Sequence, residues 1–200
     1  MKRVIEKEQR QMNILSKLSL LDYLTRSQIQ FINDLGGDRN AQRILKDMSD
    51  YISHFRDGEN IYYLNAKGRS IVGGKPRSKT LQAQHYIMRN YIYIAFGQPE
   101  TWQSEQRMEL EMKNNKKITV VADALFYDDE MTLYVVEADH TQKMIKNEKK
   151  VEKYRQLIDL GAISKKTKFI WITTTEYRRE KLKSLCEGLN TTIFTAAEFS

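Results

Sequence analysis

Two apolar runs in the second half of the chain lead into acidic residues whose spacing could support metal chemistry. The run at residues 120–122 leads into Asp123, and the run at residues 131–136 leads into Glu137 and Asp139. The short acidic link between the runs predicts a hairpin of two buried strands, which would bring the carboxylates together. Hard carboxylate oxygens suit Mg²⁺ or Mn²⁺ and not zinc. A divalent cation beside a basic surface would favour chemistry on nucleic acid.

The composition favours a globular protein with a polyanionic partner. Of the 200 residues, 30 % are charged, and 33 Lys and Arg against 26 Asp and Glu give a pI near 9.3. This balance indicates a nucleic-acid partner, although an ordinary solvated basic surface explains it equally well. The single cysteine, Cys186, excludes an intrachain disulfide and a zinc site built from several thiolates. The charged start and the lack of a run of roughly 20 apolar residues lead us to expect a cytoplasmic protein that does not enter a membrane.

The first part of the chain carries the signals of three helices. Apolar residues at helical spacing predict a first helix over residues 7–20. Thr25 and Gln28 form a capping box, which predicts the start of a second helix. This helix should end at Gly36 and Gly37, because glycine can adopt the left-handed conformation that terminates a helix.

A third predicted helix has the properties of a DNA-reading helix. We expect Asp38 as its N-cap and a buried stripe of apolar side chains on one face. Its other face presents side chains that bond phosphates and base edges. These candidate DNA-binding residues are Arg39, Asn40, Gln42, Arg43 and Lys46.

A predicted hairpin after the third helix completes the pattern of a winged helix-turn-helix. Residues 52–56 and 61–64 have strand character, and the link between them contains Gly58. Such a wing would add Arg56 to the DNA-binding residues. We therefore predict a winged-helix DNA-binding domain over residues 1–75. Two alternatives stay open, since any surface helix has a polar face and winged helices also dock proteins.

The remaining chain predicts a second domain over residues 76–200. A basic, turn-forming stretch at residues 73–78 indicates a linker between the domains. A long helix should follow from Ser78 to Phe96, and then a more polar helix over residues 102–112. The later elements are predicted as strands at 117–126, 131–137, 168–173 and 191–194, and helices at 142–160 and 176–189. This order favours a mixed sheet with helices on both faces, so the fold class is α+β or α/β.

The acidic pattern resembles the active site of the PD-(D/E)XK nuclease superfamily. Asp123 and the segment from Glu137 to Asp139 carry the resemblance. It implies that an Asp and a Glu hold Mg²⁺, and that a lysine two positions after the Glu helps to activate water. Here Asp139 occupies the lysine position, and Ala122 replaces the proline. An acid at this position could bind metal but cannot supply positive charge.

The catalytic lysine could instead come from the following helix. Lys150 shares a predicted helical face with Tyr154 and Leu157, which should pack on the sheet. The predicted catalytic residues are therefore Asp123, Glu137, Asp139 and Lys150, and the predicted metal ligands are the three acids among them. For each lysine of this helix, a solvated basic face is the simpler explanation.

The whole chain also resembles the replication-relaxation proteins of plasmids and integrative elements, which pair a winged helix with a nuclease-like domain. The resemblance rests on the order of short segments along the chain. These are Tyr23 to Thr25, Tyr62 to Leu64 with Gly68, His85 to Asn90, Trp102 with Glu105, Ala122 to Ala124, Glu137 to Asp139, Lys150 with Tyr154 and Arg155, and Arg178 with Arg179.

Three functions follow as hypotheses. The first is a DNA-binding protein of a plasmid, integrative element or phage that nicks DNA with Mg²⁺ or Mn²⁺ during replication or transfer. The second is a non-catalytic DNA-binding regulator or recruitment factor that keeps the nuclease fold as a scaffold. The third is a winged-helix module that binds mainly protein. We prefer duplex DNA binding, with cleavage open, and expect replication or conjugation machinery and a second copy of the chain as further partners.

Overall fold

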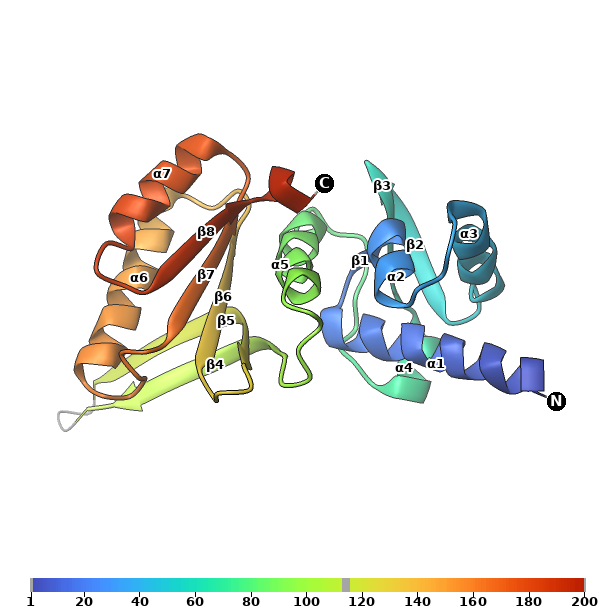
Figure 1. The fold of residues 1–200 in the computed structure, drawn as a ribbon, viewed down its shortest axis with the longest axis horizontal. Helices are drawn as coiled ribbons and strands as arrows, with labels where there is room; N and C mark the ends of the chain where they lie inside the picture. Colours follow the sequence, from blue (N-terminus) through green and yellow to red (C-terminus); the bar gives the residue numbers. More distant parts are fainter. Residues whose placement is uncertain (1, 113–115, 200) are drawn as a thin grey trace. The chain divides into compact units, whose positions relative to one another are not determined.

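The computed structural model describes the backbone of residues 2–112 and 116–199 (Figure 1). The chain divides into two compact units, Met1–Asn90 and Tyr91–Ser200. The division falls within one helix, later in the chain than the predicted domain boundary after residue 75. That boundary stays a prediction.

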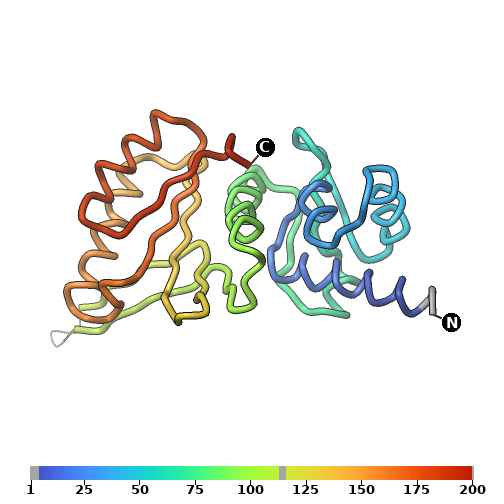
Figure 2. Tube along the Cα trace, viewed as in Figure 1, coloured from blue at the N-terminus to red at the C-terminus, as the bar shows by residue number. Residues whose placement is uncertain are grey.

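The first unit combines helices with a small antiparallel sheet (Figure 2). Its elements are α1 (Lys2–Leu21), β1 (Leu24–Thr25), α2 (Arg26–Ile32), α3 (Asp38–Asp47), β2 (Ile52–Asp57), β3 (Glu59–Leu64), α4 (Ala66–Val72) and the start of α5 (Ala83–Ala95). The sheet has the strand order β1-β3-β2, and both pairings are antiparallel. The predicted hairpin is confirmed, with Gly58 at a positive φ of 70° between its strands.

Helix α2 begins where the capping box predicted. The Thr25 side chain accepts a hydrogen bond from the backbone N–H of Gln28, and the Gln28 side chain accepts one from the N–H of Thr25. These bonds satisfy two backbone donors that a helix start leaves without partners. Gln28 also donates to the carbonyl of Ile87, which ties the start of α2 to α5 within the same unit.

Helix α3 has the predicted buried stripe, made of Ala41, Ile44, Leu45 and, just past its end, Met48. The predicted N-cap is wrong by one position, because Gly37 occupies the cap and Asp38 is the first helical residue. An acidic side chain in the first turn is favourable there, since it faces the positive end of the helix dipole.

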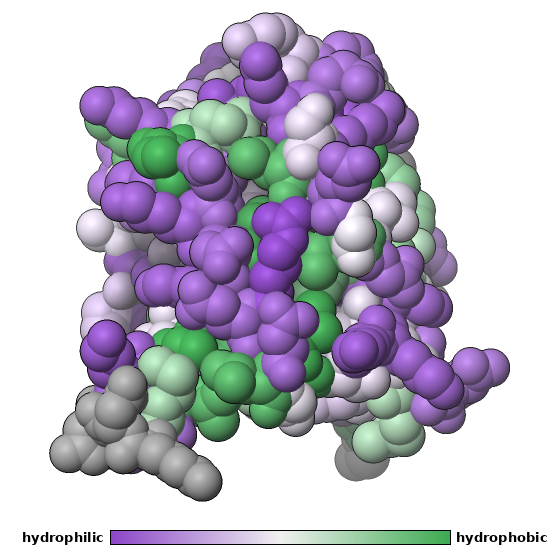
Figure 3. Space-filling view, turned by 90° about the vertical axis from the view of Figure 1, so that its left-hand side faces the viewer, coloured by the Kyte–Doolittle hydropathy of each residue, from purple (hydrophilic) through white to green (hydrophobic). Residues whose placement is uncertain are grey.

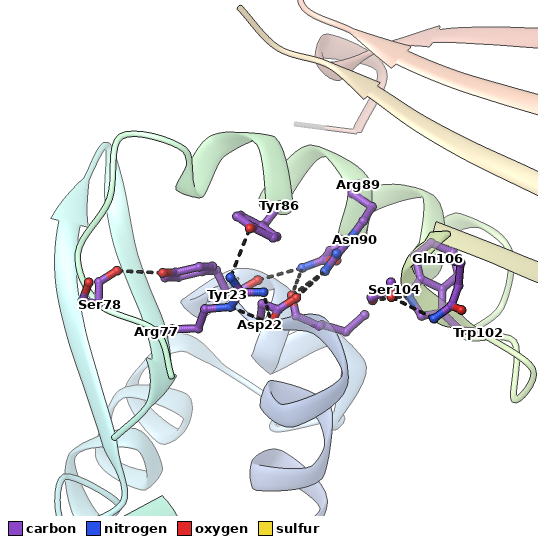
Figure 4. Close-up of polar contacts among 11 residues, drawn as sticks. Asp22, Tyr23, Arg77, Ser78, Tyr86, Arg89, Asn90, Trp102, Ser104 and Gln106 are labelled. Atoms are coloured by element: carbon purple, nitrogen blue, oxygen red, sulfur yellow. Dashed lines mark hydrogen bonds and ion pairs between the residues drawn. The ribbon is translucent and has the colours of Figure 1, made fainter. Parts of the chain in front are cut away.

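The stretch that resembles a linker is bonded to the first unit (Figure 4). Arg77 donates to the buried carboxylate of Asp22, and the Tyr23 hydroxyl donates to the carbonyl of Ser78. Arg89 contacts Asp22 from α5, and Asn90 donates to the carbonyls of Leu21 and Tyr23. Helix α5 begins at Ala83, so the predicted start at Ser78 is wrong.

The second unit is built on a mixed five-stranded sheet with the order β4-β5-β6-β7-β8. Its elements are β4 (Gln103–Glu111), β5 (Lys117–Tyr127), β6 (Leu133–Asp139), α6 (Met144–Asp159), β7 (Lys168–Thr173), α7 (Glu176–Leu185), β8 (Thr191–Thr195) and the 3-10 turn η1 (Ala196–Phe199). β4, β5 and β6 pair antiparallel, whereas β6, β7 and β8 pair parallel. The predicted mixed sheet is therefore confirmed.

Helices α6 and α7 cover one face of this sheet (Figure 1), and aromatic side chains pack on part of the other. Tyr154 of α6 and Leu182 of α7 belong to a buried core that includes Trp171 at the centre of β7. On the opposite face Phe96, just after α5, packs against Phe126 and Tyr134. Figure 3 shows the outer surface over α6 and α7, where hydrophilic side chains flank a strip of hydrophobic ones.

The polar helix predicted for residues 102–112 is wrong, because this segment forms β4. Its partly buried apolar residues alternate with exposed ones, as in a strand with one face on a core. Pairing along β5 supplies the hydrogen bonds of β4. One pair, Glu105 opposite Asp123, is missing from this ladder, although the register is the same on both sides of it, and Glu105 has a φ of 54°.

Candidate acidic centre and candidate DNA-binding helix

Glu137 and Asp139 lie two residues apart on β6 and point to the same side of the sheet, because side chains alternate along a strand. Both are fully buried beneath the helix layer. Asn147, Lys150 and Tyr154 follow one another along a single face of α6, and this face lies over β6. The predicted helical face is thus confirmed, and it brings polar groups onto both carboxylates.

Glu137 accepts hydrogen bonds from the Lys150 ammonium and the Tyr154 hydroxyl. Burial raises the pKa of Glu137 to about 8, against the opposing effect of the Lys150 charge. Burial alone would lower the pKa of Lys150, but the carboxylates of Glu137 and Asp123 outweigh it and raise that pKa. The charge of Lys150 is therefore held in place by its two acidic neighbours.

Asp123 enters the same cluster from β5, at the point where β5 and β6 part. Their regular pairing extends as far as Ala124 opposite Val136. Beyond it, the Asp123 Oδ2 accepts the backbone N–H of Ala138 at 2.7 Å, so the carboxylate replaces a strand partner. Its other oxygen, Oδ1, lies 3.8 Å from the Lys150 ammonium. We call Asp123, Glu137, Lys150 and Tyr154 the Lys150 cluster.

Asp139 has a different set of partners. The guanidinium of Arg178 in α7 donates two hydrogen bonds to the Asp139 carboxylate, with Nε at 2.7 Å from Oδ2 and Nη2 at 2.5 Å from Oδ1. Asn147 and Thr173 each donate a further hydrogen bond to it. This Arg178 cluster was not predicted as a site, although Arg178 stands in one of the segments that carry the family resemblance. Only the folded chain brings α7 to the end of β6.

The three predicted metal ligands do not form one ligand set. Within residues 2–112 and 116–199, no three His, Cys, Asp or Glu side chains are grouped to hold a metal ion. Asp139 is neutralised by Arg178, and the pair formed by Asp123 and Glu137 holds the Lys150 ammonium. A cation bound by all three carboxylates does not fit this arrangement. Asp123 and Glu137 alone could bind one if Lys150 moved away.

The candidate DNA-binding residues are mostly exposed. Four cationic or polar side chains of α3 lie on its solvent face, namely Arg39, Gln42, Arg43 and Lys46, and Arg56 is exposed on β2. Asn40 has a local role, since its amide donates to the carbonyl of Leu35 and its Oδ1 accepts from Arg43. These two bonds connect the turn before α3 to the exposed face of the helix.

The structure defines an α+β protein with a polar-faced helix in one unit and paired buried charges on a mixed sheet in the other. The chain belongs to the replication-relaxation family, whose model matches residues 15–172. A search of curated proteins finds no match. The matched span includes α3 and the Lys150 cluster, whereas Arg178 lies beyond it.

Membership of the family indicates a role in the replication or relaxation of a plasmid or another mobile element. In the part of the chain that the structure describes, we find no helix with the length and apolarity needed to cross a membrane.

Proposed function

We propose that this protein binds duplex DNA of a mobile element in the cytoplasm and acts in its replication, its transfer or their regulation. The observation that carries the proposal is the division of α3 into two faces. Ala41, Ile44 and Leu45 are buried, whereas Arg43 and Lys46 are exposed. A short helix with exposed donors on one side is suited to lie in a major groove.

The arrangement around α3 supports a winged helix-turn-helix. α2 and α3 are joined by a turn in which Gly36 has a φ of 68°, and the β2–β3 hairpin follows α3. In a winged helix, the hairpin contacts the DNA backbone beside the recognition helix. Arg56 is the exposed cation on this hairpin. A second copy of the chain would read a second half-site, and replication or conjugation machinery would be recruited to the bound DNA.

A nuclease-like scaffold is our proposal for the second unit. Asp123 and Glu137 come from neighbouring antiparallel strands, and Lys150 comes from the helix that follows the second of them. This placement agrees with the PD-(D/E)XK pattern. In the superfamily pattern, a lysine at the position of Asp139 supplies positive charge. Here that position holds an acid whose charge Arg178 neutralises, so the arrangement favours a non-catalytic scaffold.

Metal-dependent nicking is the second candidate function, and the meeting of Asp123, Glu137 and Lys150 favours it. Asp123 and Glu137 would hold Mg²⁺ or Mn²⁺, which when bound activates water and neutralises phosphate charge. Tyr154 would fix the orientation of Glu137 through its hydroxyl. Lys150 would have to exchange its carboxylate partners for water or a phosphate.

One experiment separates these functions. The protein is incubated with supercoiled plasmid from its own element and Mg²⁺, Mn²⁺ or EDTA, beside the variant Asp123→Asn/Glu137→Gln. Gels then report plasmid topology and mobility shift. A salt-sensitive shift without nicking, equal in both proteins, is the expected result. Metal-dependent nicking that the variant lacks would establish the second candidate, and no shift at low salt would exclude DNA binding.

A further inference from the structure

Each acid that the sequence offers as a metal ligand already has a cation from the helix layer. Lys150 of α6 contacts Asp123 and Glu137, and Arg178 of α7 contacts Asp139. Along β6, Glu137 is paired with a cation from α6, and Asp139 is paired with a cation from α7. Pairs of this kind resist separation, because Asp139 would be left as a buried charge without compensation and the buried carboxyl group of Glu137 would lose a hydrogen bond.

The Lys150 ammonium lies where a divalent cation bound by both Asp123 and Glu137 would lie. The ammonium is 3.8 Å from Asp123 Oδ1 and is hydrogen-bonded to the Glu137 carboxylate, so it bridges acids from two strands. The Glu137 side chain is 1 % exposed and that of Lys150 is 20 % exposed. A cation that enters must displace the ammonium and shed much of its own hydration shell, which Mg²⁺ does reluctantly.

Neighbouring contacts hold Lys150 in this position. Tyr154 lies one turn further along α6 and bonds the other oxygen of Glu137. Asn147 lies one turn earlier and bonds Asp139. Both side chains are buried, so α6 cannot rotate to withdraw Lys150 without breaking them. Because the ammonium is tethered to the same chain, it competes with free metal as an intramolecular ligand.

We infer that Lys150 is an internal counter-cation that occupies the metal position of the nuclease-like unit and keeps divalent metal out of the native protein. This inference goes beyond DNA binding and holds whether or not α3 contacts DNA. It assigns Lys150 a positioning role: the lysine joins α6 to the point where β5 and β6 part. Removing the ammonium should therefore uncover a site for a hard cation between Asp123 and Glu137.

The test is a titration of the full-length protein with Mn²⁺, followed by the electron paramagnetic resonance signal of the free ion. Wild type is compared with Lys150→Met, with Lys149→Met as the matched control for an exposed lysine on the same helix. We expect Lys150→Met to bind one Mn²⁺ roughly tenfold or more tightly than wild type, a ratio within the usual range of coupling between competing ligands. Lys149→Met should behave as wild type. Adding Glu137→Gln to Lys150→Met should abolish the gain.

Two outcomes of the titration would overturn the inference. One is tight Mn²⁺ binding by wild type that Asp123→Asn/Glu137→Gln removes, and the other is a folded Lys150→Met protein with no gain. If Lys150→Met does not fold, wild type gives the answer through the ¹⁵N resonance of the Lys150 ammonium. That signal should persist unchanged in millimolar Mg²⁺, and its displacement by Mg²⁺ would show that metal enters. A mobility shift on the same samples reports DNA binding separately, so failure of one proposal does not imply failure of the other.

Discussion

At the scale of single residues, the second unit depends on charge pairs that burial makes costly to break. Asp139 is fully buried, and its compensating charge comes from an arginine that is 22 % exposed. Arginine suits this role because its planar guanidinium can donate two parallel hydrogen bonds to one carboxylate. The pair links α7 to the end of β6, so its loss should affect stability before it affects any function.

We expect Arg178→Met to destabilise the protein by about 3 kcal/mol, because it leaves a buried carboxylate without a cation. The control is Arg178→Met with Asp139→Asn, which removes both charges and should recover a large part of the loss. Urea denaturation followed by tryptophan fluorescence gives the free energies of unfolding. A single variant as stable as wild type would show that the guanidinium contributes nothing to the stability of the fold.

Glu137 should make stability depend on pH. Its pKa is about 8 in the folded protein against an ordinary value of 4.5. Between these values the folded protein keeps a proton that the unfolded chain has lost, so the free energy of unfolding falls as pH rises and then levels off. Lys150 has a raised pKa, so its contribution is lost only at higher pH, above its ordinary value of 10.5.

The comparison that isolates this effect is wild type against Glu137→Gln, which cannot titrate. Denaturation curves collected at several pH values between 4.5 and 8 should show a decline in wild-type stability that the variant lacks. Parallel pH profiles for the two proteins would mean that Glu137 is ionised in the fold at the same pH as in the unfolded chain.

At the scale of elements, the packing of α4 shows how a close approach between two backbone segments requires glycine at one position. A Cβ on Gly68 would lie 2.2 Å from the backbone oxygen of Tyr51 and 3.1 Å from Cδ2 of Leu64. Asn65 caps the helix through the N–H of Gly68, which fixes the glycine at this contact. The helix can therefore pack against the start of the hairpin only if this position has no side chain.

Gly68→Ala should destabilise the first unit by about 2 kcal/mol or more, because the overpacking exceeds the roughly 1 kcal/mol that alanine adds to a helix. Ser70→Ala, at an exposed site in the same helix, is the control and should change stability by at most about 0.5 kcal/mol. Thermal unfolding by circular dichroism measures both. An equal effect of the two substitutions would contradict the close approach of α4 to the Tyr51 backbone.

Local patterns predicted the elements whose partners are close in the sequence. The capping box at Thr25 and the apolar stripe of α3 are signals within one or two turns, and the structure confirms both. The prediction for residues 102–112 was wrong because the acids at Glu105 and Glu109 suggested a polar helix. The alternating apolar residues of this segment, Met108 and Leu110, gave the contrary signal.

The candidate site was predictable only in part for the same reason. Helical spacing placed Lys150 over the sheet, and the strand pattern placed Asp123 beside Glu137. The partner of Asp139 was not predictable, since Arg178 lies 39 positions later in the chain. No local pattern shows which cation a buried acid will meet across a parallel crossover.

At the scale of the whole molecule, binding to DNA should depend strongly on salt. Four exposed cations belong to the proposed DNA face: Arg39, Arg43, Lys46 and Arg56. If each neutralises one phosphate, the logarithm of the association constant should fall with the logarithm of salt concentration with a slope of about −3 to −4. Fluorescence anisotropy with a labelled duplex measures this slope.

Arg43→Ala should weaken binding by about 1 kcal/mol, roughly fivefold, and reduce the steepness of the salt dependence by about one. Its stability should stay near that of wild type, because Arg43 is exposed and its partners Asn40 and Asp47 lie on the same helix. Unchanged affinity and slope would remove α3 from the DNA interface. The contrasting control is Lys149→Met, which lies in the other unit and should leave both quantities unchanged.

The lone cysteine makes this protein convenient for fluorescence work. Cys186 is 3 % exposed, and burial raises the pKa of its thiol to about 11. At neutral pH only about one thiol in ten thousand would be the reactive thiolate. A maleimide dye should therefore not react with the native wild-type protein, and it should attach once to a Gln42→Cys variant. Intact mass spectrometry counts the dyes attached to each protein. The native cysteine can stay in place while a probe on α3 reports each encounter with DNA.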